Sequence, residues 1–200
     1  MKARPELPAE GGIAAARPEL DGCLKEMARN LADRFADLCD GAISDLLRHQ
    51  ISAANADEGT VWLLDASGEF LLPRFNSGHN AERLVAGFRQ SIREGMISMV
   101  VATEQPICEN AVQANDRQDK TLDKLLGLQT CAMLAVPLYF AGELRGVMSA
   151  VQLAAAGTEA VSRPGFTIDD LAALQRTTTI LSRLIEHQLL LACLGMEGVV

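Results

Sequence analysis

The N-terminal quarter of the chain changes from an irregular pattern of residues to a helical one. Residues 1–18 hold three prolines and two adjacent glycines without a hydrophobic period, so we expect a disordered tail there. From Leu20 onward, apolar residues recur every three or four positions, which predicts an amphipathic helix. Gly41 interrupts this stripe, which then resumes as far as Ile51. A helical segment is therefore expected ahead of the first strand.

Two stretches of the chain have the composition of β-hairpins. Thr60–Leu64 and Glu69–Phe75 are rich in β-branched and aromatic residues and flank a turn that ends in Ser-Gly. Thr130–Phe140 and Glu143–Leu153 predict a longer hairpin that turns at an Ala-Gly pair. Because Pro137 cannot donate to a strand ladder, we expect an open edge or a bulge at that position.

Helices are predicted between and after the two hairpins. Apolar residues have helical spacing over 81–93 and over 96–102, and a brief strand is expected at 107–108. After the second hairpin, Thr167 is a good N-cap for a long helix with an imperfect heptad pattern. The order of elements predicts one α+β domain over residues 19–193, with an antiparallel sheet, flanking helices and a short tail over 194–200.

Charge and cysteine content narrow the class of protein. Lys and Arg number 18 against 26 Asp and Glu, which gives a net charge of -8 and argues against a nucleic-acid partner. No stretch reaches the roughly 18 apolar residues of a membrane helix, and the N-terminus does not resemble a signal peptide. The five cysteines are irregularly spaced, as is typical of reduced thiols. We therefore expect a cytoplasmic protein without a membrane partner.

The sequence holds no recognisable catalytic or metal-binding motif. The three histidines are far apart and have no paired-ligand spacing, so we expect no metal site. Phosphate-loop and nucleophile-elbow motifs are missing as well. We expect that the protein is not an enzyme and has no catalytic residues, and the sequence identifies no cofactor.

Ordered fragments of the chain resemble the GAF domain family of small-molecule sensors. The fragments are Ala102–Ile107, Asn115–Arg117, Leu134–Leu138, Gly142-Glu143, Gly146-Val147 and Phe166–Leu171, and residues 59–78 are similar to the opening hairpin of the family. The resemblance implies a PAS-related antiparallel sheet of about six strands with long terminal helices. It also implies a pocket on one sheet face, roofed by residues 80–130, and a homodimer formed through the terminal helices.

This resemblance and the residue types together suggest a candidate site. Methionines and the single tryptophan suit an adaptable apolar pocket, although core packing explains them equally simply. Polar residues on the proposed roof could contact a ligand or stand in solvent. The candidate ligand-binding residues are Trp62, Phe75, Met96, Met99, Cys108, Asn115, Asp116, Arg117, Thr130 and Met133. The candidate dimer-helix residues are Leu174, Leu181 and Ile185.

Three functional interpretations remain open. The leading hypothesis is a regulatory module that binds an unknown small molecule and relays its state through the terminal helices to a signalling partner or dimer mate. The second is a thiol redox enzyme of the free methionine sulfoxide reductase type, acting through Cys108 or Cys131. The third is a ligand-free dimerisation scaffold.

Two ligand classes of the family fit the sequence poorly. The segment from Asp116 to Thr130 resembles the cyclic-nucleotide-binding branch, but Gln152 and Leu153 stand where the signature of that branch has an Asn-Lys pair, and Leu171 replaces its glutamate. Covalent bilin attachment often uses a cysteine followed by histidine, and this chain has no such pair.

Overall fold

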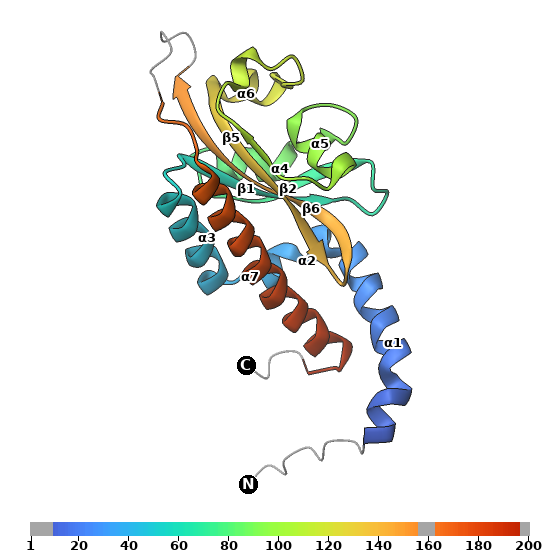
Figure 1. Cartoon of the computed structure of the whole chain (residues 1–200). Helices are drawn as coiled ribbons and strands as arrows, with labels where there is room; N and C mark the ends of the chain where they lie inside the picture. The colour runs from blue at the N-terminus through green and yellow to red at the C-terminus, as the bar shows by residue number, and fades with distance from the viewer. Residues whose placement is uncertain (1–9, 156–162, 197–200) are drawn as a thin grey trace.

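The computed structural model describes residues 10–155 and 163–196, which form a sheet with helices on both faces (Figure 1). Neighbouring strands are all antiparallel, in the order β3-β2-β1-β6-β5-β4. The strands are β1 (Glu58–Leu64), β2 (Phe70–Asn76), β3 (Gln90–Ser91), β4 (Ile107–Glu109), β5 (Leu128–Phe140) and β6 (Glu143–Ala155). The predicted α+β class, with about six antiparallel strands, is confirmed.

The helices divide into two groups that cover opposite faces of the sheet (Figure 1). One face packs against α1 (Glu10–Arg29), α2 (Leu31–Leu38), α3 (Gly41–Ala53) and α7 (Ile168–Cys193). The other face lies under α4 (Ala81–Gly87), α5 (Met96–Thr103) and α6 (Thr121–Leu126), and a single 3-10 turn, η1 (Val112–Ala114), precedes α6. We call these the helix face and the roofed face.

Side chains along each strand alternate between the two faces. In β1, Val61 and Leu63 join the large core of the helix face, whereas Trp62 joins the smaller cluster of the roofed face. In β6, Met148 and Ala150 face the helices, whereas Val147 lies in the cluster of the roofed face. The sheet is therefore buried on both faces, which explains the nearly continuous apolar runs of β1, β5 and β6.

A bulge at the start of β5 changes which face the strand presents. Thr130 pairs with Leu153, but Ala132 pairs with Gln152, so one residue of β5 is left over at Cys131. In a strand that alternates regularly, residues two positions apart, such as Thr130 and Ala132, share a face. With the extra residue, Ala132 packs in the helix-face core and Thr130 lines the cavity on the roofed face.

Pro137 lies at an open edge, as predicted. Its strand β5 has β6 on one side and the short β4 on the other, and β4 begins opposite Ala135. Pro137 still pairs in register with Val147 of β6. Its missing N–H therefore costs no ladder hydrogen bond, because the outer side of β5 is unpaired at this point.

The long helix α7 begins at a capping box and packs along the sheet. Thr167 Oγ1 accepts from Asp170 N at 3.2 Å, and the Asp170 carboxylate accepts from Thr167 N at 2.8 Å. Leu174, Leu181 and Ile185, which the heptad pattern suggested for a dimer contact, are at most 2% exposed in the helix-face core. This interpretation needs correction, because burial against the chain's own sheet explains their spacing.

Two amide side chains tie the start of α7 to the sheet. Asn110, just after β4, accepts from Phe166 N at 2.7 Å and donates to Phe166 O at 2.9 Å. Gln152 of β6 is fully buried, accepts from Gly165 N at 3.0 Å and donates to Asn55 O at 3.0 Å. The backbone of Gly165 and Phe166, just before α7, is thus held by side chains from β6 and from the residue after β4.

Two sequence-based boundaries differ from the structure. Helix α1 already begins at Glu10, so the expected disordered tail is wrong for residues 10–18, where an alanine-rich run favours helix despite Pro18; residues 1–9 lie outside the described part. The helix expected over 81–93 ends at Gly87, and Gln90–Ser91 forms β3 instead. Glycine and the extended backbone of Phe88 end the helical turn.

The orientation of α7 can be tested with two leucines of the same helix. Leu181 is fully buried, whereas Leu184 is 40% exposed. We expect Leu181→Ala to lower the free energy of unfolding by about 2–5 kcal/mol and Leu184→Ala by less than about 1 kcal/mol. Urea unfolding followed by circular dichroism measures both, and equal losses would contradict the packing of α7.

Candidate functional site

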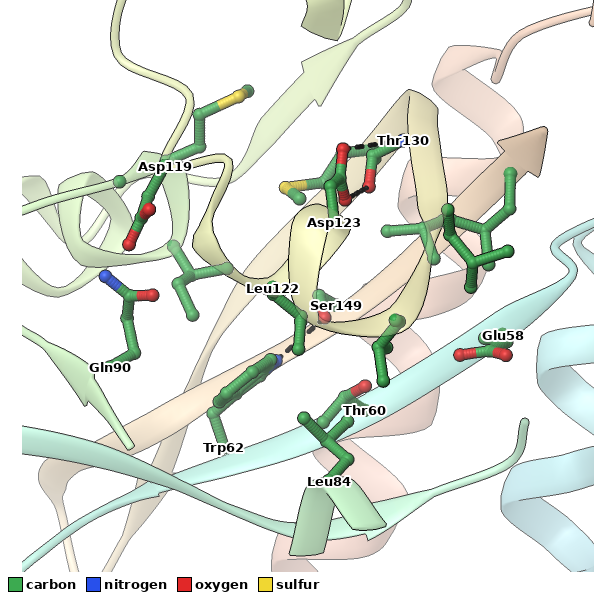
Figure 2. A pocket seen from close by; sticks show the side chains of 18 of the residues that line it. Glu58, Thr60, Trp62, Leu84, Gln90, Asp119, Leu122, Asp123, Thr130 and Ser149 are labelled. Carbon is green, nitrogen blue, oxygen red and sulfur yellow. Dashed lines mark hydrogen bonds between the residues drawn. The ribbon is translucent and has the colours of Figure 1, made fainter. Parts of the chain in front are cut away.

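A cavity of about 90 Å³ lies between the sheet and α4, α5 and α6 (Figure 2). Its floor comes from β1, β2, β5 and β6, and its roof comes from the three helices and the loop before α6. The lining residues are Glu58, Thr60, Trp62, Asn76, Leu84, Gln90, Gly95, Met96, Ile97, Gln118, Asp119, Leu122, Asp123, Leu126, Leu128, Thr130, Met133, Ser149, Val151 and Leu153.

The floor of the cavity carries polar side chains at interior strand positions. Trp62 Nε1 donates to Ser149 Oγ at 2.9 Å, across the paired strands β1 and β6. Asn76 Nδ2 donates to Thr60 Oγ1 at 2.9 Å, across β1 and β2. Thr60, Asn76 and Ser149 are all at least 94% buried, so each polar group needs such a partner. The floor is therefore rigid and polar at its centre.

The roof helix α6 is held by hydrogen bonds more than by apolar packing. None of its six residues is buried. The Asp123 carboxylate accepts from Thr130 Oγ1 at 2.7 Å, from Thr130 N at 2.9 Å and from Gln118 Nε2 at 2.9 Å. Figure 2 shows the first two bonds joining α6 to the start of β5. Leu122 packs against the apolar cluster of the roofed face, but α6 differs from α4 and α5 in that none of its residues is buried.

A corner of the cavity brings Gln90 and Asp119 together beside Gly95. Gly95 has a φ of 83°, and a Cβ on it would lie 3.3 Å from both the Asp119 Cβ and the Gln90 Nε2. The Gln90 amide nitrogen donates to Glu94 O at 3.0 Å. Burial raises the pKa of Asp119, but hydrogen bonds from Thr121 and Gln90 and the charge of Lys124 outweigh burial, so the pKa lies below its ordinary value. Asp119 is therefore ionised at neutral pH.

The lining is acidic. Glu58, Asp119 and Asp123 contribute carboxylates, and no Lys, Arg or His occurs among the lining residues that the structure describes. Gly78 leaves room for the Glu58 side chain, because a Cβ on Gly78 would collide with the Glu58 carboxyl group. The rest of the lining is mainly Leu, Ile, Val and Met with the Trp62 ring, whose edge meets Phe88 at 6.1 Å between centroids.

Comparison with known proteins shows the family to which this chain belongs. The GAF domain family matches residues 26–186 of the chain. The chain belongs to the GAF domain family. This match covers most of the predicted 19–193 unit, and GAF domains serve as sensory and regulatory modules in signalling proteins. A search of curated proteins finds no match.

Solved structures share the GAF fold at low sequence identity. The GAF domain of a phosphoenolpyruvate-protein phosphotransferase from Coxiella burnetii is 19% identical with a TM-score of 0.61, over 87% of this chain and 95% of that one. A free methionine-R-sulfoxide reductase from Neisseria meningitidis is 18% identical with a TM-score of 0.53, over 93% and 96%. The GAF domain of a sensor histidine kinase from Bacillus halodurans is 19% identical with a TM-score of 0.52, over 72% and 92%. At such identities only the fold is shared.

The structure brings four of the ten candidate ligand-binding residues of this GAF domain to the cavity. They are Trp62, Met96, Thr130 and Met133. Phe75 is buried on the helix face, where the Arg48 guanidinium lies 5.5 Å from its ring centre. A bulge between β1 and β2 places Phe75 opposite Val61, so it cannot reach the roofed face.

The other five candidates lie outside the cavity lining. Cys108 packs beside the helix-face core, with its sulfur 3.7 Å from Phe166 O. Asn115 Nδ2 donates to Glu109 Oε2 at 3.0 Å and holds the loop that follows η1. Met99, Asp116 and Arg117 line a shallow depression on the outer side of the roof. These five residues therefore do not contribute to the cavity lining.

Signals in the sequence are weaker for the polar residues that do line the cavity. Thr60 is two residues from Trp62 in β1, and Ser149 is paired with Thr60 across β1 and β6, so the alternation of side chains places all three on the same face of the sheet. Gln90 was missed because the helical spacing over 81–93 hid β3, although Gly87 marks the helix end. Asp119 and Asp123 lie in a polar loop and a short helix whose side-chain directions depend on tertiary contacts.

Other chemistries are poorly supported in the described residues. Burial raises the pKa of the Cys108 thiol, with Asp170 and Glu109 adding to the effect, and burial and Asp123 raise the pKa of Cys131. Neither sulfur lines the cavity. Within residues 10–155 and 163–196, no group of three metal-ligating side chains is found, and no helix has the length and apolarity to cross a bilayer.

These thiols should react slowly. Because the pKa of Cys108 and of Cys131 is raised, little thiolate is present at pH 7, so iodoacetamide should label both more slowly than free cysteine. The labelling rate should rise roughly tenfold per pH unit while pH stays below the pKa. Peptide mapping by mass spectrometry after timed labelling measures each site, and fast labelling of either cysteine at pH 7 would favour redox chemistry.

Proposed function

We propose that this GAF domain is a sensory module that binds a small molecule in the cavity under α4, α5 and α6. The observation that carries the proposal is the cavity itself, which combines a rigid polar floor with a roof helix that has no buried residue. A binding site needs a preformed floor for recognition and a movable element for entry. Sites of this kind are few in a domain of this size.

The proposal includes a physical connection from the roof to α7. The segment between β4 and α6 carries both Asn110, which binds the Phe166 backbone, and Gln118 and Asp119, which line the cavity. A ligand that orders this segment therefore also favours one position of the residues before α7. We propose α7 as the element that passes the ligand state to a partner.

Dimerisation and location complete the proposal. The outer side of α7 exposes Ile180 by 46% and Leu184 by 40%, and a second copy of the chain would cover these residues in a homodimer. The five cysteines are unpaired, which suits the reducing cytoplasm. A ligand-free scaffold is less favoured, because the roofed face keeps a cavity where close packing would be expected.

Binding in the cavity is tested by two variants of α6. Leu122 lines the cavity, whereas Leu125 on the same helix is 41% exposed and is not among the lining residues. We expect Leu122→Phe to fill the space and abolish binding of fragments of about four or five non-hydrogen atoms, while Leu125→Phe leaves binding unchanged. A fragment library screened by thermal shift and native mass spectrometry measures this. No hits, or hits that persist in Leu122→Phe, would contradict the proposal.

The connection to α7 is tested with a confirmed fragment and the variant Asn110→Ala. Binding should change the hydrogen-exchange rates of amides in the first turns of α7 in the wild-type domain, because the roof segment and Phe166 move together. In Asn110→Ala the fragment should still bind, but the change in α7 should be reduced several-fold. An unchanged response in α7 would show that the relay takes another route.

A further inference from the structure

The charge of the cavity points to the chemical class of its ligand. Three carboxylates line it, at Glu58, Asp119 and Asp123, without a basic side chain among the described lining residues. Lys124 lowers the pKa of Asp119 but is not one of the lining residues. These carboxylates would repel an anionic ligand, and a partly buried carboxylate favours a cationic partner.

One amide oxygen that faces the cavity has no hydrogen-bond donor among the described residues. Gln90 is 7% exposed, and its Nε2 donates to Ser91 O and Glu94 O and lies beside Asp119, whereas no described residue donates to its Oε1. Figure 2 shows this oxygen turned toward the interior of the cavity, in the corner where Asp119 lies above it. Gln118 Oε1 also has no partner among the described residues, but it is buried away from the open space of the cavity. A complementary ligand must therefore supply an N–H or O–H donor to Gln90 Oε1, in addition to what it offers the carboxylates.

The orientation of both amides is fixed by their neighbours. The Gln90 nitrogen faces two backbone carbonyls, and the Gln118 nitrogen faces the Asp123 carboxylate at 2.9 Å. Exchanging the oxygen and nitrogen of either amide would set an oxygen against an oxygen. Both unfilled positions are thus acceptors, and a ligand without donors would leave Gln90 Oε1, the one that faces the cavity, unsatisfied.

The size of the cavity limits the rest of the ligand. An engineered cavity of about 150 Å³ holds benzene, which has six non-hydrogen atoms, so a cavity of about 90 Å³ has room for about four or five. Trp62, Leu84 and Leu122 offer an apolar surface beside the polar corner (Figure 2). A short hydrocarbon body with a charged donor group at one end matches this division.

We propose that the cavity binds a small organic cation that carries a primary ammonium group on a short apolar body. The ammonium has N–H donors for the Asp119 carboxylate and the Gln90 oxygen, and the hydrocarbon part packs on the Trp62 ring. This inference rests on the proposed function of the cavity as the ligand site. It separates this domain from any relative whose ligand is recognised through a phosphate or carboxylate.

The test uses three probes of similar shape in the wild-type domain. They are n-butylammonium, 1-butanol and n-butyrate, titrated at constant ionic strength. Trp62 is the only tryptophan of the chain and its Nε1–H lies in the cavity floor, so its indole resonance in a ¹H–¹⁵N correlation spectrum reports on the site. We expect saturable binding of n-butylammonium at least about tenfold tighter than that of 1-butanol, and no saturable response to n-butyrate.

A matched pair of variants assigns the preference to the cavity. In the wild-type domain, Asp119 Oδ1 accepts a hydrogen bond from Thr121 N at 2.8 Å. Asp119→Asn removes the charge but keeps a side-chain oxygen that can accept this bond. This variant should weaken n-butylammonium about tenfold and leave 1-butanol unchanged. Asp116→Asn removes an exposed carboxylate outside the cavity and should change neither. The spectrum without ligand checks that each variant is folded.

The outcomes separate this inference from the proposed function. If 1-butanol or n-butyrate binds at least as tightly as n-butylammonium, the ammonium preference is wrong, but the cavity remains a ligand site. If n-butylammonium binds tightly and Asp116→Asn weakens it as much as Asp119→Asn does, surface charge explains the result and the inference fails. If none of the probes saturates the Trp62 response, the inference is overturned, and the fragment screen alone decides the proposed function.

Discussion

The burial of the central sheet on both faces is the constraint on which the rest of the structure depends. Successive side chains of β1, β5 and β6 point to opposite faces, so each strand must satisfy two environments at once. On the helix face the strands contribute almost purely apolar residues to a core with α1, α2, α3 and α7. On the roofed face the same strands supply the hydroxyl, amide and indole groups of the cavity floor. Alternate positions of the same strands therefore supply the helix-face core and the lining of the cavity.

The sequence pattern was sufficient for the elements that depend on local chemistry. The two hairpins, the Thr167 cap and the open edge at Pro137 follow from turn residues, capping geometry and a missing N–H. The heptad spacing of α7 was misleading, because a helix that packs on its own sheet and a helix that packs on a second copy repeat their apolar residues in the same way. Only the position of the sheet shows that Leu181 faces inward.

The site was less predictable, because its residues meet through contacts between distant segments. Trp62 was a candidate because of its residue type and Thr130 because of the family resemblance, and the structure brings both to the cavity lining. Phe75 lies on the opposite face, since a bulge reverses the direction of its side chain. Gln90 and Asp119 are 29 positions apart in the numbering and meet only beside Gly95, whose positive φ lets the chain turn there. No periodicity in one sequence records such a meeting.

The bulge at Cys131 has a consequence for how this domain can change in evolution. Thr130 reaches the Asp123 carboxylate from its position opposite Leu153 of β6. Loss of the Cys131 codon would remove the bulge but leave Thr130 opposite Leu153 and Ala132 opposite Gln152, so Thr130 would still point toward α6. A one-residue slip of Thr130 against β6 would instead turn it to the other face. The attachment of the roof therefore depends on the register of β5 against β6, and the bulge is a place where the strand can lose a residue without losing that register.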